Sequence, residues 1–114
     1  MTYKVQILKS AQAQIIQQTR YVREKFGADK ARQSYDTITT KLTGLKDNPR
    51  SKGIRVQELE DLGIMNYRIM LHANHTKALY DIDDSKQLVT VHMVYGSAQD
   101  FQTLLYDRII RHLP

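Results

Sequence analysis

The sequence contains no cysteine and no tryptophan, and it has only two prolines among 114 residues. Without cysteine the chain cannot form a disulfide, a thiolate zinc site or a thiol nucleophile, which is typical of cytoplasmic proteins. No apolar stretch approaches the roughly 20 residues that span a bilayer. The opening residues MTYKVQILKS also lack the apolar stretch and cleavage site of a signal peptide. We therefore expect a cytoplasmic protein with no membrane contact.

The length and charge of the chain narrow its class further. A chain of 114 residues has the size of one ordinary domain, so residues 1–114 should form a single domain. The hydrophobic fraction of 41% and the charged fraction of 25% are typical of globular proteins. A net charge of +5 favours nucleic acid or an acidic protein as a partner, although many small basic domains are simply soluble.

The first half of the chain predicts one strand and two helices. Residues Tyr3 to Leu8 alternate with a period of two, which indicates a strand. Ser10 can cap a first helix that Gly27 ends, and Asp29 can cap a second helix that stops before Pro49. Helices joined so tightly should form an antiparallel hairpin. The apolar stripes of the two helices are Ala11, Ile15, Thr19, Val22 and Phe26, and Ala31, Tyr35, Ile38, Leu42 and Leu45.

The second half alternates with a period of two and then becomes helical. Short links rich in turn residues predict an antiparallel meander. The four strand candidates are Ile54 to Leu59, Met65 to Ala73, Lys77 to Ile82 and Leu88 to Tyr95. A last helix should run from Ala98 to Leu113. This order predicts an α+β domain in which an N-terminal strand and a helical hairpin precede a small antiparallel sheet, with the hairpin on one face and the other face open.

The predicted open face carries the candidate catalytic side chains. Because strand side chains alternate, Tyr67, Val91 and Met93 should point to the core, and Asp81 should point away from it together with Arg68, His72, Lys77 and His92. Arginine and lysine could hold a phosphate, and a histidine could move a proton of a ribose hydroxyl. The same residues could equally be the solvated side of a half-covered sheet. Tyr95 falls on the predicted core side at the strand end, where a buried ring with a wet hydroxyl is common.

Metal and carboxylate chemistry are not indicated. His72 and His75 flank a predicted hairpin turn and have no third ligand at a recognisable spacing. The acidic cluster of Asp81, Asp83 and Asp84 is more typical of the tip of a β-hairpin, where aspartates accept hydrogen bonds from nearby backbone amides. We therefore expect no metal and no cofactor.

Three stretches together resemble the ParE/RelE superfamily of toxins from bacterial type II toxin–antitoxin systems. They are SAQAQIIQQTRYVREKFGADKA, similar to the first helix and its turn, GIRVQELEDLGIMNYRIMLH, similar to the following strands, and ALYDIDDSKQLVTVHMVYGSAQDF, similar to the final hairpin. The resemblance covers about residues 3 to 101. It implies a strand, a helical hairpin and an antiparallel sheet, which is also the fold that the periodicity predicts.

The resemblance implies one of two targets. RelE-like members cut messenger RNA on the ribosome with basic residues and a histidine or tyrosine, whereas ParE-like members poison DNA gyrase. The stretches ELEDLG, NYRIML and SAQDF look nearer to ParE. Many members carry a histidine or arginine just after the last strand, where this chain has Gly96 and Ala98. The leading hypothesis is therefore a gyrase inhibitor that does no chemistry, with a role in plasmid stabilization and growth arrest.

Two alternatives stay open. A ribosome-dependent endoribonuclease would use Arg68, His72, His92 and Tyr95, and a degenerate toxin would retain only antitoxin binding. Arg55, Arg68 and Lys77 are candidates for contact with nucleic acid or the target. Leu104 and Ile110, left over from the apolar face of the last helix, could bind a ParD-like or other DNA-binding antitoxin or simply complete the core. Toxin and antitoxin would act together on operator DNA, which the antitoxin would contact.

Overall fold

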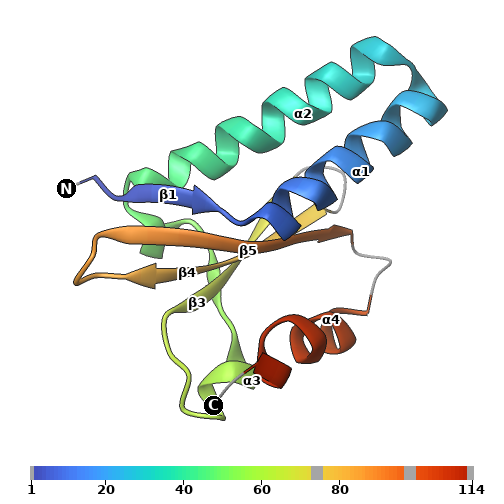
Figure 1. Ribbon diagram of the computed structural model, residues 1–114. Helices are drawn as coiled ribbons and strands as arrows, with labels where there is room; N and C mark the ends of the chain where they lie inside the picture. Colours follow the sequence, from blue (N-terminus) through green and yellow to red (C-terminus); the bar gives the residue numbers. More distant parts are fainter. Residues whose placement is uncertain (1, 73–75, 97–99, 113–114) are drawn as a thin grey trace.

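The computed structural model describes residues 2–72, 76–96 and 100–112, and their elements occur in the expected order (Figure 1). The strands are β1 (Lys4–Ile7), β2 (Ile54–Arg55), β3 (Tyr67–His72), β4 (Thr76–Asp83) and β5 (Leu88–Gly96). The helices are α1 (Lys9–Phe26), α2 (Ala28–Thr43), α3 (Gln57–Glu60) and α4 (Phe101–Arg108). The predicted α+β class is therefore confirmed. No helix among these residues is long and apolar enough to cross a bilayer.

The described strands form a single sheet in the order β1-β5-β4-β3-β2. Strands β3, β4 and β5 follow one another as the predicted antiparallel meander, and β2 adds to it antiparallel at the β3 edge. Strand β1 lies parallel to β5, with Lys4 opposite Leu88 and Ile7 opposite Val91. Parallel neighbours need a long connection, and here the helical hairpin and the whole meander supply it.

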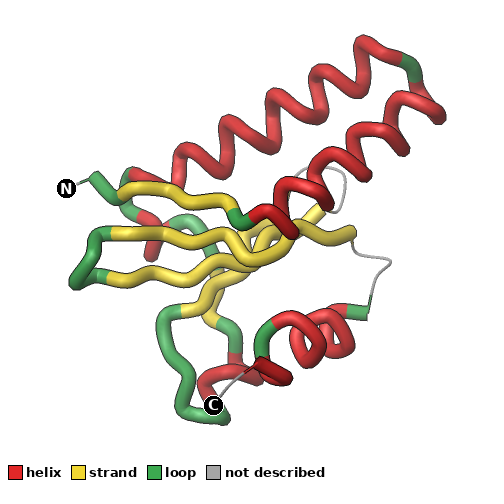
Figure 2. The backbone as a smooth tube through the Cα atoms, viewed as in Figure 1, coloured by secondary structure: helices red, strands yellow, loops and turns green. Residues whose placement is uncertain are grey.

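The hairpin of α1 and α2 packs on one face of the sheet, as predicted (Figure 2). Gly27, with φ of 95°, makes the tight turn between the two helices, a backbone conformation that glycine adopts without strain. The core between hairpin and sheet consists of Ala11, Ile15, Ile38, Leu42, Leu45, Met70, Ala78, Tyr80, Ile82, Val89, Val91 and Val94. Burial of this apolar surface is the main stabilising contribution to the fold.

The predicted capping residues do not cap their helices. Helix α1 begins at Lys9, and the Ser10 hydroxyl instead donates to the carbonyl oxygen of His92 at 3.4 Å. Helix α2 begins directly after Gly27, so Asp29 lies inside its first turn. There a carboxylate still favours the helix through its dipole.

The prediction of an open second face is wrong. Helices α3 and α4 cover part of that face, and a second core lies beneath them. Its buried members are Val56, Leu59, Leu79, Met93, Tyr95, Leu105 and Ile109. We call this side of the sheet the α4 face and the opposite side the hairpin face. Both faces of the sheet are therefore partly buried, and successive side chains along a strand enter different cores.

Two predicted elements are shorter than expected. The strand predicted for residues 54–59 ends at Arg55, because Val56 and Leu59, three residues apart, both enter the second core when residues 57–60 turn into α3. The last helix begins at Phe101, where Asp100 caps it by accepting from the Gln102 backbone amide at 3.1 Å. Ala98 and Leu113, the bounds predicted for this helix, lie outside the described residues.

A β-bulge interrupts the pairing of β4 and β5. Leu79 pairs with Met93, but the next residue, Tyr80, pairs with Val91. His92 is therefore the extra residue, and the alternation of β5 changes phase at this point. Val91 lies in the hairpin-face core, whereas Met93 lies in the α4-face core. The expectation that Val91, Met93 and Tyr95 share one face is wrong for this reason.

Candidate functional site

The β-bulge brings three polar side chains together on the α4 face of the sheet. Tyr67 begins β3 and lies opposite Asp81 of β4. The bulged residue His92 of β5 contacts the same carboxylate through Nε2, and its ring centroid lies 5.2 Å from that of Tyr67. Each of the central three strands thus supplies one member of this cluster, which we call the bulge cluster.

The bulge cluster is partly buried but open to solvent. The side chains of His92 and Asp81 are 19% and 23% exposed, so a substrate atom could reach them. Burial, and to a smaller extent the charge of Asp81, raises the pKa of Tyr67 to about 12. Its hydroxyl therefore keeps its proton at neutral pH. Tyr67 can donate a hydrogen bond there but cannot act as a base.

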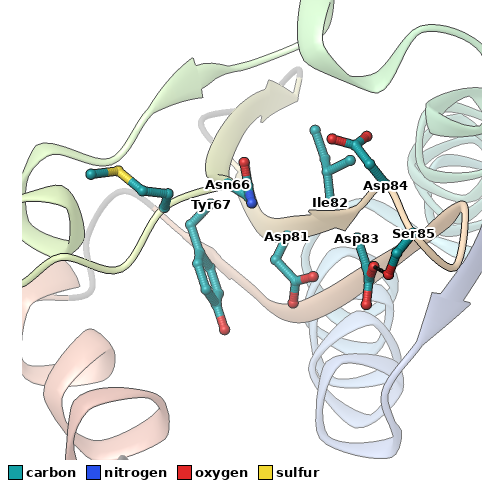
Figure 3. A pocket seen from close by; sticks show the side chains of 8 residues that line it. Asn66, Tyr67, Asp81, Ile82, Asp83, Asp84 and Ser85 are labelled. Carbon is teal, nitrogen blue, oxygen red and sulfur yellow. Dashed lines mark hydrogen bonds between the residues drawn. The ribbon is translucent and has the colours of Figure 1, made fainter.

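A hollow of about 480 Å³ lies beside the bulge cluster, and acidic side chains dominate it (Figure 3). Asp81, Asp83 and Asp84 all line it, together with Asn66, Tyr67 and Ser85. Asp83 accepts from the Ser85 hydroxyl at 2.7 Å and from the Lys86 backbone amide at 3.1 Å, which is the arrangement expected from the sequence for the turn of this β-hairpin. These hydrogen bonds hold the pKa of Asp83 below its usual value. A phosphate would be repelled from this hollow.

A second hollow, of about 270 Å³, shares Tyr67 with the first and is lined by three arginines. Each arginine already has a partner. Arg55 forms a two-pronged pair with Glu60 at 2.7 and 2.8 Å, Arg50 pairs with Asp84, and the Nε of Arg68 donates to the Gly53 carbonyl at 3.2 Å. The pair with Arg55 holds the pKa of Glu60 below its usual value. A phosphate would have to displace these partners.

The structure separates residues that the sequence placed together. Arg68 pairs across the strands with Tyr80, which lies in the hairpin-face core. Lys77 pairs with Tyr95, whose ring lies in the α4-face core, and His92 joins Asp81 on that same face. Lys77 and His92 therefore share a face as predicted, but Arg68 lies on the opposite one, so the predicted cluster of all three on one open face is wrong. His72 belongs to β3, but its side chain is outside the described residues, as are all of His75 and Ala98.

Tyr95 is a core residue in this structure. Its side chain is 2% exposed, and its ring stacks on Phe101 with centroids 5.4 Å apart. Burial, followed by the charge of Glu58, raises its pKa to about 12. Leu104 and Ile110 are half-buried against the same core, so much of their apolar surface is already used within the chain.

The sequence reasoning missed two members of the bulge cluster. Tyr67 was expected in the core and Asp81 at the turn of a β-hairpin, whereas both side chains lie against His92. The alternation did place Asp81 and His92 on one side of the sheet. What it could not show was the bulge, which brings their side chains into contact.

The bulge cluster contains some of the groups that acid–base catalysis needs. An imidazole beside a carboxylate can exchange a proton, and a phenol can donate a hydrogen bond. Cleavage of a phosphodiester also needs a cation for the charge that develops on phosphorus. The nearby arginines are engaged with other groups. Within the described parts of the chain, no three His, Cys, Asp or Glu side chains are placed to hold a metal.

Solved structures of bacterial toxins have the same fold. The chromosomal ParDE TA system from P. aeruginosa matches with a TM-score of 0.66 and 12% identity, over 82% of this chain and 94% of that one. This chain has the ParE/RelE toxin fold. The toxin–antitoxin complex RelBE2 from Mycobacterium tuberculosis matches with a TM-score of 0.61 and 17% identity, over 87% of this chain and 95% of that one.

The E. coli toxin RelE, in a mutant form and in the free state, matches over the full length of both chains, with a TM-score of 0.58 and 17% identity. No family model and no curated protein sequence matches the chain significantly. The similarity is therefore one of structure, and it includes both ParE and RelE toxins.

Proposed function

We propose that this protein is the toxin of a bacterial type II toxin–antitoxin system and that a cognate antitoxin neutralises it. The observation that carries this proposal is the shared fold, which extends over most or all of each toxin chain compared. Two of the solved structures named above are toxin–antitoxin systems by name. The expected location is the cytoplasm, and the expected effect is growth arrest of the host, with plasmid stabilization as the biological role.

DNA gyrase is the proposed target, and inhibition involves no chemistry by the toxin. The arrangement of the candidate residues supports this choice. Tyr95 is buried, Arg68 faces the opposite side of the sheet from His92, and the arginines near the bulge cluster are paired. A nuclease site would need a free cation beside its base, and the described residues do not bring these together.

A ribosome-dependent endoribonuclease is the second candidate, and the bulge cluster is the observation that favours it. The contact of His92 with Asp81 could orient the imidazole for proton transfer. Arg55, which is 69% exposed, could exchange Glu60 for a phosphate of the messenger RNA. This candidate therefore requires His92, Asp81 and an arginine to act together. Substitution of these residues would distinguish it from gyrase inhibition.

The antitoxin is proposed to be acidic where it covers the toxin. A net charge of +5 would attract an acidic segment that folds as it binds, and the exposed parts of Leu104 and Ile110 could contact its apolar side chains. The antitoxin would also make the contacts with operator DNA. Such a partner fits the TA systems to which the matching ParDE and RelBE2 structures belong.

The test is controlled expression in a bacterial host that carries separate reporters for DNA damage and for message stability. Gyrase poisoning should stop growth, induce the DNA-damage reporter and leave messages intact. Growth arrest with message loss and no DNA damage would favour the ribonuclease. Normal growth at full expression would identify a degenerate toxin that only binds its antitoxin.

A further inference from the structure

The far end of the helical hairpin concentrates positive charge. Residues 20–32, which we call the hairpin tip, include the end of α1, the turn at Gly27 and the start of α2. Figure 1 shows this end extending away from the sheet and from α4. The hairpin tip carries five basic and two acidic side chains, a net +3 of the chain's +5. Its basic residues are Arg20, Arg23, Lys25, Lys30 and Arg32, all of them exposed.

The basic side chains of the hairpin tip have no ion-pair partners within the described part of the chain. The ion pairs found there join Arg50 to Asp84 and Arg55 to Glu60, and His92 contacts Asp81. Arginines near the sheet are thus compensated, while those of the hairpin tip are not. Five exposed cations close together repel one another, and a polyanion would relieve that repulsion.

Aromatic side chains accompany these cations. Phe26 is 67% exposed and Tyr21 is 57% exposed, although large aromatic side chains usually bury most of their surface. Tyr21 also lines a hollow with Val94 of β5 and Leu104 of α4, whereas Phe26 directly precedes the turn at Gly27. Beside such cations, exposed aromatic rings can pack on the sugars of a nucleic acid while the cations bind its phosphates.

We propose that the hairpin tip binds the phosphate backbone of duplex DNA. A duplex carries one negative charge per about 1.7 Å of its axis, so several cations can bind phosphates at once. The major groove, about 12 Å wide, admits one helix, and two helices side by side are too broad for it. The tip should therefore lie across the backbone and bind without strong sequence preference. A protruding tip is less suited to an acidic peptide, which binds best in a groove.

This binding goes beyond the proposed toxin function and does not depend on it. If gyrase is the target, the hairpin tip would contact the DNA that the enzyme holds while another surface contacts the enzyme. Duplex binding can be measured with the toxin alone, without gyrase or ribosomes. The result for the hairpin tip is therefore separate from the result for the target.

The experiment measures fluorescence anisotropy of a labelled 20-base-pair duplex as purified full-length protein is added at several salt concentrations. The test variant replaces Arg20, Arg23 and Arg32 by Gln. The matched control replaces Lys4, Lys46 and Lys86 by Gln, which removes the same charge from exposed positions outside the tip. Circular dichroism and melting temperature confirm that both variants fold, as expected for exposed positions.

The proposal predicts a loss of affinity of about tenfold or more for the tip variant and less than about threefold for the control. Each lost phosphate contact should reduce the slope of log K against log salt by about 0.9, so the tip variant should lose about 2 to 3 units of slope. Phe26→Ala should weaken binding and leave the slope unchanged. Equal losses in the two triple variants would overturn the proposal. So would tighter binding of single-stranded RNA or of poly-glutamate than of the duplex.

Discussion

His92 contacts Asp81 on the neighbouring strand because a bulge in β5 makes this histidine the extra residue of the pairing. Tyr67 completes the cluster from the next strand. Bulges often re-aim a side chain beside a functional site, and here the bulge joins the chain's clearest acid–base pair. Whether that pair acts in toxicity is a question that substitutions can answer.

The first prediction concerns this pair. Asp81→Asn and His92→Gln should leave growth arrest within about twofold of the unchanged protein, because a gyrase inhibitor needs no proton transfer. Arg68→Ala should behave the same way with its fold intact. The measurement is colony survival after induction, with protein level checked by immunoblot and Asp107→Asn as an exposed control. Loss of toxicity in all three variants, with normal folding, would establish the ribonuclease instead.

The second prediction concerns the buried hydroxyl of Tyr80, which donates to the Pro49 carbonyl at 2.7 Å. This bond holds the basic loop before β2 against the sheet. Gly53 lies so close that a Cβ there would meet the Tyr80 hydroxyl at 2.7 Å. Tyr80→Phe should lower the free energy of unfolding by about 1 to 2 kcal/mol, because it removes a buried hydrogen bond and leaves the Pro49 carbonyl with only the longer bond from the Lys52 amide, at 3.4 Å. Urea unfolding measures this change. Tyr35→Phe, at a 44% exposed position, should change it little.

The third prediction concerns alkaline pH. Burial raises the pKa of Tyr67, Tyr80 and Tyr95 to about 12, from an ordinary value of 10.0. The folded protein therefore keeps these protons where the unfolded chain loses them. The resulting stability is fully present below pH 10 and is lost as the pH rises toward 12. Circular dichroism and phenolate absorbance should show cooperative unfolding in this window. Tyr95→Phe should make stability less dependent on pH between 10 and 12, whereas an unchanged dependence would contradict the role of burial.

The fourth prediction concerns the docking of α4. Leu105 is 1% exposed and packs in the α4-face core with Tyr95 and Ile109. Leu105→Ala should lower the free energy of unfolding by about 2 to 4 kcal/mol, because it removes buried methyl groups and leaves a cavity. Leu62→Ala removes the same atoms from a 57% exposed position and should cost much less. Equal effects in chemical denaturation would mean that α4 does not pack as the structure shows.

Local patterns predicted much of the fold. The apolar stripes of α1 and α2 and the alternation of β3, β4 and β5 each depend on neighbouring residues. Their hydrophobic periodicity therefore identified these elements to within a few residues. The α+β class and the placement of the hairpin on one face followed from their order. Gly27 ended the first helix as expected because its left-handed conformation suits glycine.

Features that depend on distant contacts were not predictable in this way. The parallel pairing of β1 depends on β5, which comes much later in the chain. The bulge at His92 leaves no signal in the alternation of β5, so Met93 was assigned to the wrong face. Alternation also suggested an open face, because it cannot show that α3 and α4 return to cover a surface that includes Leu79 and Met93. The candidate site was therefore only partly predicted, with Asp81 and Tyr67 outside it.

The central claim is that this protein inhibits gyrase and does not cut RNA. Its most direct test adds purified protein to gyrase with relaxed plasmid and ATP and, in parallel, to translating ribosomes. The account predicts that supercoiling is lost, that cleaved DNA accumulates and that the message stays intact. Message cut at the ribosome while gyrase remains active would contradict it and would make His92 and Asp81 the residues of a nuclease site.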